Sequence, residues 1–206
     1  MSEKSFIYRS IFIYRFIMNL LYLGRYRKRF NVVIQQIKLL PSGASILELC
    51  FGDVYIAEFC KKAGYHWKGL DINKHFVKTA QQMGFDADYA DLEALEVFPK
   101  GDACIMMGSL YHFHSNTAAI LSKMLQATDN IIISEPVSNL SSNQGLLGFL
   151  ARRAANAGKG NETFRYDKSS FMAMIDANSK PLGYDRTIIE EQGKDLVVKL
   201  IKNEKT

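Results

Sequence analysis

The sequence predicts an α/β protein with a mainly parallel sheet, an antiparallel C-terminal hairpin and an N-terminal helical extension. Residues 45–71 give the first indication, because a short apolar strand, a glycine-containing turn, a helix-like run and a second strand follow one another there. The second indication is the run 130–134, whose succession of isoleucines is typical of a buried parallel strand. Two strand-like runs on either side of Gln192-Gly193-Lys194-Asp195 predict the hairpin.

The other elements follow from hydrophobic periodicity and turn signals. A helix over 31–40 should end at Pro41-Ser42-Gly43, since proline and glycine interrupt helices. After residue 136 the sequence becomes polar and glycine-rich, and helical periodicity resumes at 167. In chain order the expected helices are 31–40, 54–63, 74–83, 117–127 and 167–177, and the expected strands are 45–49, 66–71, 88–90, 102–107, 130–134, 184–190 and 196–201.

Composition limits the function classes. The 206 residues suit one domain, and 48% hydrophobic with 23% charged residues is ordinary for a globular protein. Three cysteines without metal-ligand spacing indicate reduced thiols in a cytoplasmic protein and no metal site. The net charge of +5 is concentrated in residues 1–30, which carry seven basic residues and one acid, 7 − 1 = +6, so the body carries 5 − 6 = −1. A body so close to neutral argues against nucleic acid as a partner.

The N-terminal segment 5–30 is both apolar and basic. Arg9 and Arg15 interrupt its apolar runs, so it does not supply the roughly 20 apolar residues of a membrane span. We expect residues 1–40 to form one or two helices that serve as an extension or a lid. These helices either pack on the body or lie on a membrane surface, because arginines beside aromatic and aliphatic residues suit an anionic interface. In the second case the protein would be peripheral at the inner membrane surface.

Three acids stand at the ends of three successive predicted strands. Glu48 ends the first strand, Asp71 ends the second, 71 − 52 = 19 residues after Gly52, and Asp91 follows the third. Carboxyl ends of parallel strands are where open α/β sheets bind ligands. One carboxylate can accept hydrogen bonds from both ribose hydroxyls, so the sequence predicts a nucleotide site there. Each acid has a structural alternative as a helix cap or turn former.

Together these motifs resemble class I S-adenosylmethionine-dependent methyltransferases. The run Glu48-Leu49-Cys50-Phe51-Gly52 resembles the family's first strand and glycine-rich turn, although Cys50 and Val54 stand where glycine is common. The resemblance implies a Rossmann-like three-layer sandwich with a seven-stranded sheet over 41–206, in which 137–180 is an acceptor-side insertion. It also implies S-adenosyl-L-methionine as the cofactor, S-adenosyl-L-homocysteine as the product, and Glu48, Cys50 and Gly52 in the cofactor site.

The resemblance extends along the next strands. It implies that Asp71 binds the ribose hydroxyls and that Ile72 packs on the adenine. Asp91 and Leu92 would face the adenine amino group, and Met107 and Gly108 would lie beneath the methionine part of the cofactor.

The acceptor is expected to be a small or lipid-linked molecule. His112 is the leading candidate for a general base, because imidazole titrates near neutrality. Glu135, at the end of the fifth strand, is a second candidate for base or orienting group. Arg29 or Tyr26 is a candidate for binding the cofactor carboxylate. A transfer that needs only proximity, a methyltransferase-like scaffold without activity, and a dinucleotide-dependent oxidoreductase remain as alternatives.

Overall fold

A computed structural model describes residues 11–22, 24–137, 164–192 and 195–203. Seven strands form one sheet in the order β3-β2-β1-β4-β5-β7-β6. β7 runs antiparallel to both of its neighbours, and the other neighbouring pairs are parallel. The strands are β1 (Ser45–Leu49), β2 (His66–Asp71), β3 (Asp86–Tyr89), β4 (Ala103–Met107), β5 (Asn130–Pro136), β6 (Tyr184–Gln192) and β7 (Asp195–Lys202). This topology confirms the predicted fold class.

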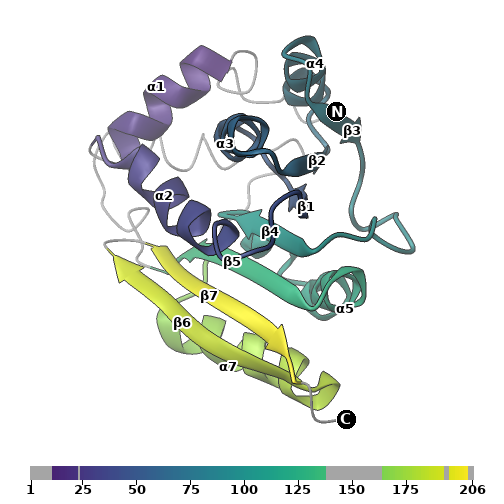
Figure 1. Cartoon of the computed structure of the whole chain (residues 1–206). Helices are drawn as coiled ribbons and strands as arrows, with labels where there is room; N and C mark the ends of the chain where they lie inside the picture. The colour runs from purple at the N-terminus through teal and green to yellow at the C-terminus, as the bar shows by residue number, and fades with distance from the viewer. Residues whose placement is uncertain (1–10, 23, 138–163, 193–194, 204–206) are drawn as a thin grey trace.

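Helices cover both faces of the sheet and complete the three layers (Figure 1). On one face α2 (Tyr26–Ile37), α3 (Tyr55–Ala63) and α4 (Lys74–Gln82) bury side chains against strand residues such as Ile46 and Ile105. On the other face α5 (Thr117–Ala127) and α7 (Lys168–Ser179) pack against residues such as Leu47 and Met106. Neighbouring residues of a strand point to opposite faces, so the consecutive apolar residues of β1 and β4 supply both cores.

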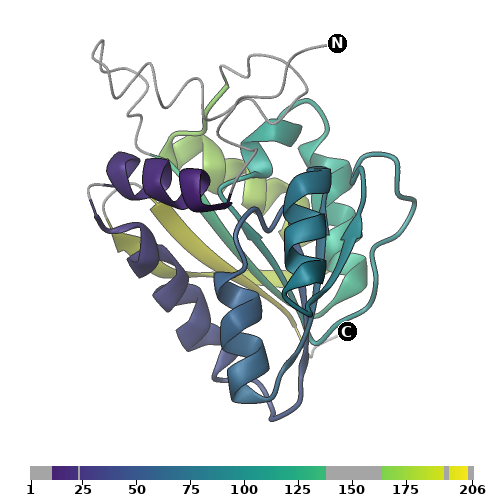
Figure 2. The same cartoon turned by 90° about the horizontal axis from the view of Figure 1, so that it is seen from above.

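The N-terminal segment contributes two packed helices. α2 shares a hydrophobic core with the sheet, and Tyr26, Phe30, Val33 and Ile37 form its buried stripe at helical spacing. α1 (Ile11–Leu21) lies across the carboxyl ends of the strands, near the loop between β1 and α3 (Figure 2). Among the described residues, no helix is long and apolar enough to cross a membrane.

The expected elements differ from the observed ones mainly at their ends. The helix expected over 31–40 begins earlier, at Tyr26, and ends at Ile37. The sequence predicts helices in the leader 5–30 and a separate helix over 31–40, whereas α2 joins Tyr26–Phe30 to the second of these, and both Tyr26 and Phe30 are buried. α7 begins one residue after its predicted start because Asp167 is its N-cap in a capping box with Ser170. Residues 5–10 of the predicted leader and 138–163 of the predicted acceptor-side insertion lie outside the described residues.

Candidate functional site

The loop after β1 has the backbone of a glycine-rich turn. Gly52 has φ of 54°, and Cys50 has φ of 53°, the one positive φ of a residue other than glycine in the described part of the chain. Cys50 thus keeps the left-handed conformation that glycine adopts most readily. Val54 has φ of −91°, so a β-branched side chain fits there without backbone strain. The loop therefore preserves a glycine-type course at Cys50 although the glycine itself is missing.

Asp71 holds this loop in place from the end of β2. Its Oδ2 accepts a hydrogen bond from the Gly52 amide at 3.0 Å, and its Oδ1 accepts one from the Asn73 amide at 2.7 Å. The side chain is buried, and Asn73 in turn caps α4. Ile72 lies between them, half-buried. Two charge-assisted hydrogen bonds fix the orientation of the carboxylate.

Glu48 lies beside this loop but binds the neighbouring strand. Its Oε2 accepts a hydrogen bond of 2.7 Å from the Trp67 indole nitrogen, and the residue is almost wholly buried. Burial raises the pKa of Glu48 well above its usual value, and only the Trp67 hydrogen bond opposes this shift. In the structure Glu48 is therefore a buried group that joins β1 to β2. Its predicted cofactor contact stays a prediction.

The predicted adenine side of the site follows β3. The Ala90 amide donates to the Asp71 carbonyl oxygen at 3.0 Å, so the ends of β2 and β3 lie together. Asp91 is half-buried, and its Oδ1 accepts a hydrogen bond from the Glu93 amide at 3.2 Å. Leu92 is buried in the core. The structure thus brings Asp71 and Asp91 to the same edge of the sheet, as expected.

Met107 and Gly108 end β4 on the same edge. Met107 is buried, and the Gly108 amide donates to the Ser134 carbonyl oxygen at 2.6 Å. Gly108 has φ of 63°, and a Cβ atom there would lie 2.6 Å from Nη2 of Arg29. The left-handed backbone favours glycine here, and a side chain would also have to displace the Arg29 guanidinium.

Arg29 is a buried cation at the centre of this edge. Its Nε lies 3.1 Å from Oδ2 of Asp195, and the Tyr22 hydroxyl donates to the other Asp195 oxygen at 3.2 Å. Burial disfavours the charged guanidinium, but Asp195 and the nearby tyrosines outweigh it and raise the pKa of Arg29. Its Nη2 has no hydrogen-bond partner among the described residues. A buried donor of this kind is available to an anionic ligand.

α1 covers the loop from outside. Arg15 binds Asp53 through Nε at 3.0 Å and Nη2 at 2.7 Å, and Asp53 is buried. The Tyr14 hydroxyl lies 3.3 Å from the position that a Cβ of Gly52 would take. Burial raises the pKa of Tyr14 to about 12, so its hydroxyl stays protonated. Tyr14 and Arg15 therefore close the space above the loop.

The two predicted catalytic residues occupy different environments. Glu135 is fully buried, and its Oε2 accepts a hydrogen bond of 3.0 Å from the Leu110 amide at the start of the short helix η2 (Leu110–Phe113). Burial raises the pKa of Glu135 to about 8. His112 lies in η2 and is half-buried, with its ring 4.0 Å from that of Tyr111. Glu135 therefore positions the segment that carries His112, and the catalytic roles of both residues remain predictions.

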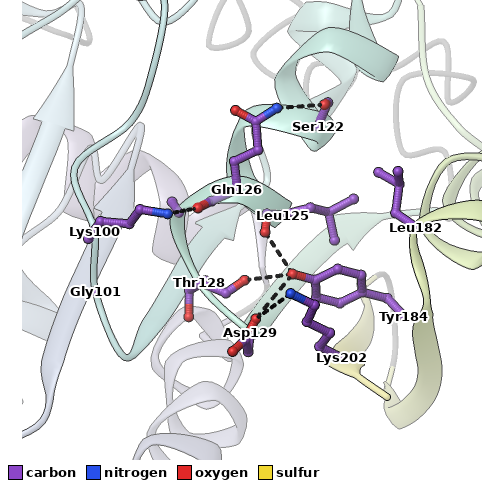
Figure 3. Close-up of a pocket in the computed structure, with 11 residues that line it drawn as sticks. Lys100, Gly101, Ser122, Leu125, Gln126, Thr128, Asp129, Leu182, Tyr184 and Lys202 are labelled. Atoms are coloured by element: carbon purple, nitrogen blue, oxygen red, sulfur yellow. Dashed lines mark hydrogen bonds and ion pairs between the residues drawn. The ribbon is translucent and has the colours of Figure 1, made fainter. Parts of the chain in front are cut away.

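A pocket of about 650 Å³ lies at the opposite edge of the sheet (Figure 3). Its lining residues precede β4, β5 and β6, begin β6 or end β7, whereas the predicted site residues lie at or after the carboxyl ends of β1 to β5. Tyr184 fills one side and donates its hydroxyl to the Leu125 carbonyl oxygen at 2.7 Å. Lys100 donates to the Gln126 carbonyl oxygen, so both side chains bind the end of α5. Tyr184 and Lys100 thus stabilise the end of α5, and the pocket that they line is separate from the candidate site.

Within the described residues, no group of three or more His, Cys, Asp or Glu side chains is placed to hold a metal ion. Cys50, Cys60 and Cys104 are thiols. Burial raises the pKa of Cys60 to about 12 and also raises that of Cys104, so neither thiol is activated.

Solved structures show which fold this is. The magnesium protoporphyrin IX methyltransferase of Synechocystis PCC 6803, solved with S-adenosylhomocysteine (SAH), superposes with a TM-score of 0.63 at 14% identity, over 91% of this chain and 86% of that one. The DhpI–SAM–HEP complex gives 0.63 at 11% identity, over 97% of this chain and 99% of that one. A Rhodobacter sphaeroides protein described provisionally as a Zn-dependent alcohol dehydrogenase gives 0.58 at 12% identity, over 79% and 85%.

The chain therefore has the fold of class I S-adenosylmethionine-dependent methyltransferases. No protein-family model and no curated protein matches the sequence. Identities this low establish the fold alone, and the activity has to be argued from the site.

Proposed function

We propose that this chain is an S-adenosylmethionine-dependent methyltransferase that acts on a small or lipid-linked acceptor. The observation that carries the proposal is the loop after β1, where Cys50 and Gly52 are both left-handed and Asp71 holds the Gly52 amide at 3.0 Å. Such a loop lets backbone approach a ligand closely at the carboxyl ends of the strands. Similar structures that bind S-adenosylmethionine or S-adenosylhomocysteine share the surrounding fold, which supports this choice of ligand.

The residues present fit the nucleoside part of S-adenosylmethionine. Asp71 would accept hydrogen bonds from the ribose hydroxyls, because its carboxylate lies at the end of β2 beside the loop that carries Gly52. Ile72 would pack on the adenine ring. Asp91 would face the adenine amino group, with Leu92 behind it.

The methionine part of the ligand meets a second fitting feature, the buried Arg29. Its Nη2 has no hydrogen-bond partner among the described residues and lies against Gly108, at the end of the strand that also carries Met107. A carboxylate placed there would satisfy the buried donor in a charge-assisted hydrogen bond. Asp195 would hold the guanidinium in position through the pair at 3.1 Å.

The chain's own residues then have to orient the acceptor and exclude water. Bound S-adenosylmethionine supplies a methyl group that its sulfonium already makes electrophilic, and S-adenosylhomocysteine is the product. Alignment of the two reactants can contribute roughly 7–11 kcal/mol to the barrier reduction. Tyr14 and Arg15 shield the loop from solvent on the α1 side.

Proton transfer is needed only for an acceptor such as a hydroxyl. His112 would accept this proton, because an imidazole is neutral and basic near neutral pH. Glu135 keeps its own proton below about pH 8 because it is buried. At neutral pH it would therefore orient η2 and the acceptor, and it would act as a base only at higher pH.

Two alternatives make different predictions. A scaffold without activity is favoured by the missing glycine at Cys50, yet the left-handed backbone there argues that the loop still has its ligand-binding shape. An oxidoreductase that binds a dinucleotide needs bare backbone along the loop, where this chain has side chains at Cys50 and Val54. Binding of nucleotides to the purified protein separates all three.

The test compares S-adenosylhomocysteine with 5′-methylthioadenosine, which keeps the adenosine and lacks the amino acid part. We expect Arg29→Met to weaken S-adenosylhomocysteine binding at least about 30-fold, since a buried charge pair contributes about 2–5 kcal/mol. Methylthioadenosine binding should change less than about threefold, and Arg29→Lys should restore part of the loss. Equal losses for both nucleotides, in variants that circular dichroism shows to be folded at the titration temperature, would contradict the assigned role of Arg29. Absence of binding by the wild-type protein would refute the proposed function.

A further inference from the structure

The N-terminal helices have an outer surface that the cofactor site does not use. Tyr14, Met18 and Tyr22 lie on one stripe of α1 and its following turn and pack against the body. Phe16 and Leu20, one helical turn apart, lie on the other side and are 70% and 44% exposed. The exposed side chains of this phenylalanine and leucine place apolar surface in water, and burying that surface against a partner would be favourable.

The basic residues of this segment divide into two groups. Arg15 and Arg29 are bound inside the protein by Asp53 and Asp195. Arg25, Arg27, Lys28 and Lys38 are exposed. No acidic residue occurs between Lys4 and Leu47, so no carboxylate of the segment neutralises these exposed charges.

We infer that the N-terminal helices dock on an anionic lipid bilayer through the exposed apolar side chains of Phe16 and Leu20 and through exposed cations such as Arg25 and Lys28. The two apolar side chains would enter the boundary between headgroups and acyl chains, and the cations would bind the lipid phosphates. The inner side of the same helix covers the loop at Gly52 through Tyr14. Docking would thus place the candidate site next to the membrane, where a lipid-linked acceptor resides. This last step rests on the proposed function, whereas the docking itself does not.

The experiment is sedimentation of the full chain with vesicles of phosphatidylcholine alone or mixed with phosphatidylglycerol. We expect binding to the mixed vesicles only, with affinity falling as salt is raised. Arg25→Gln and Lys28→Gln should each weaken binding about fivefold. Phe16→Ser with Leu20→Ser should weaken it at least tenfold, whereas Leu182→Ser, at a 51% exposed leucine on η3 (Lys180–Leu182), should leave it unchanged.

Three results would overturn this inference. The first is no sedimentation of the wild-type protein with the mixed vesicles. The second is equal binding by the Phe16→Ser, Leu20→Ser variant. The third is self-association in solution that this variant abolishes, because the surface would then bind a second copy of the chain. S-adenosylhomocysteine titration without vesicles separates the two proposals, because these surface substitutions should not change it. If the wild-type protein does not bind S-adenosylhomocysteine, the proposed function is refuted, whereas the inference of membrane docking still stands on vesicle binding.

Discussion

The left-handed conformation of Cys50 predicts an unusual order of stability among substitutions at this position. A residue with a side chain pays about 1–2 kcal/mol for this conformation, and glycine avoids that cost. Glycine in turn lowers the stability of the folded protein by about 0.5–1 kcal/mol, because it gives the unfolded chain more conformational freedom. Removing the half-buried thiol lowers the stability by a similar amount. Cys50→Gly should therefore lie within about 1 kcal/mol of the wild-type protein. Cys50→Ala keeps the strained backbone and loses the thiol, so it should be less stable than Cys50→Gly.

Cys60 provides the matched control because it is a buried cysteine in the middle of α3. Glycine within a helix costs about 1 kcal/mol relative to alanine, so Cys60→Gly should be less stable than Cys60→Ala. The measurement is urea unfolding followed by circular dichroism for all four variants. The predicted order is glycine above alanine at position 50 and alanine above glycine at position 60. Alanine above glycine at both positions would refute the backbone argument.

Three further predictions concern buried charged and polar pairs. Arg15→Ala should destabilise the protein by about 2 kcal/mol in urea unfolding, because Asp53 then stays buried without its cation. The double variant with Asp53→Asn should recover part of this loss. Additive losses from the two substitutions would contradict the pairing. Trp67→Phe should cost about 1–3 kcal/mol by leaving Glu48 without its donor, and a much smaller loss in the Glu48→Met background, which has no side-chain oxygen to accept the bond, would support this cause. Glu135 has a folded-state pKa of about 8, above its unfolded value, so its contribution to stability is present below about pH 4.5 and is lost as the pH rises through 8. Glu135→Gln should remove this part of the pH dependence, roughly 1.4 kcal/mol per pH unit within that window, and an unchanged slope would show that Glu135 is ionised in the folded protein.

The sheet was predictable from the sequence because its strands are short, buried and clearly bounded. The run at 130–134 is apolar on both faces of the sheet, as a central strand requires, and it forms β5. The acids at Asp71 and Asp91 were found from their positions after predicted strands, and they do lie on one edge. Local patterns were sufficient here because a strand end and a turn are defined by a few consecutive residues.

The contacts that enclose the site were not predictable, because they join distant parts of the chain. Arg15 and Asp53 are 38 residues apart, and Tyr22 and Asp195 are 173 apart. Asp195 was read only as part of a hairpin turn. One feature of the sequence does indicate such contacts. The segment from Lys4 to Leu47 has no acidic residue, so a buried arginine in it can pair only with a carboxylate from elsewhere in the chain.

Glu48 shows the same limit over a shorter distance. Its position near the end of β1 predicts a ligand contact, which stays a prediction, and does not indicate the hydrogen bond that its carboxylate accepts from Trp67 on the neighbouring strand. The Trp67 ring lies over Gly69, which pairs with Glu48 in the sheet and leaves room for the indole. This arrangement depends on the register of two strands, which the sequence pattern does not specify.

The most direct test of the central claim is calorimetric titration of the purified protein with S-adenosylmethionine and S-adenosylhomocysteine, with NAD as the control. We predict micromolar binding of both sulfur nucleotides and none of NAD. Asp71→Ala should abolish this binding, because the variant loses the ribose contact and releases the Gly52 amide. A folded wild-type protein that binds neither sulfur nucleotide would contradict the account and leave a scaffold with a methyltransferase fold.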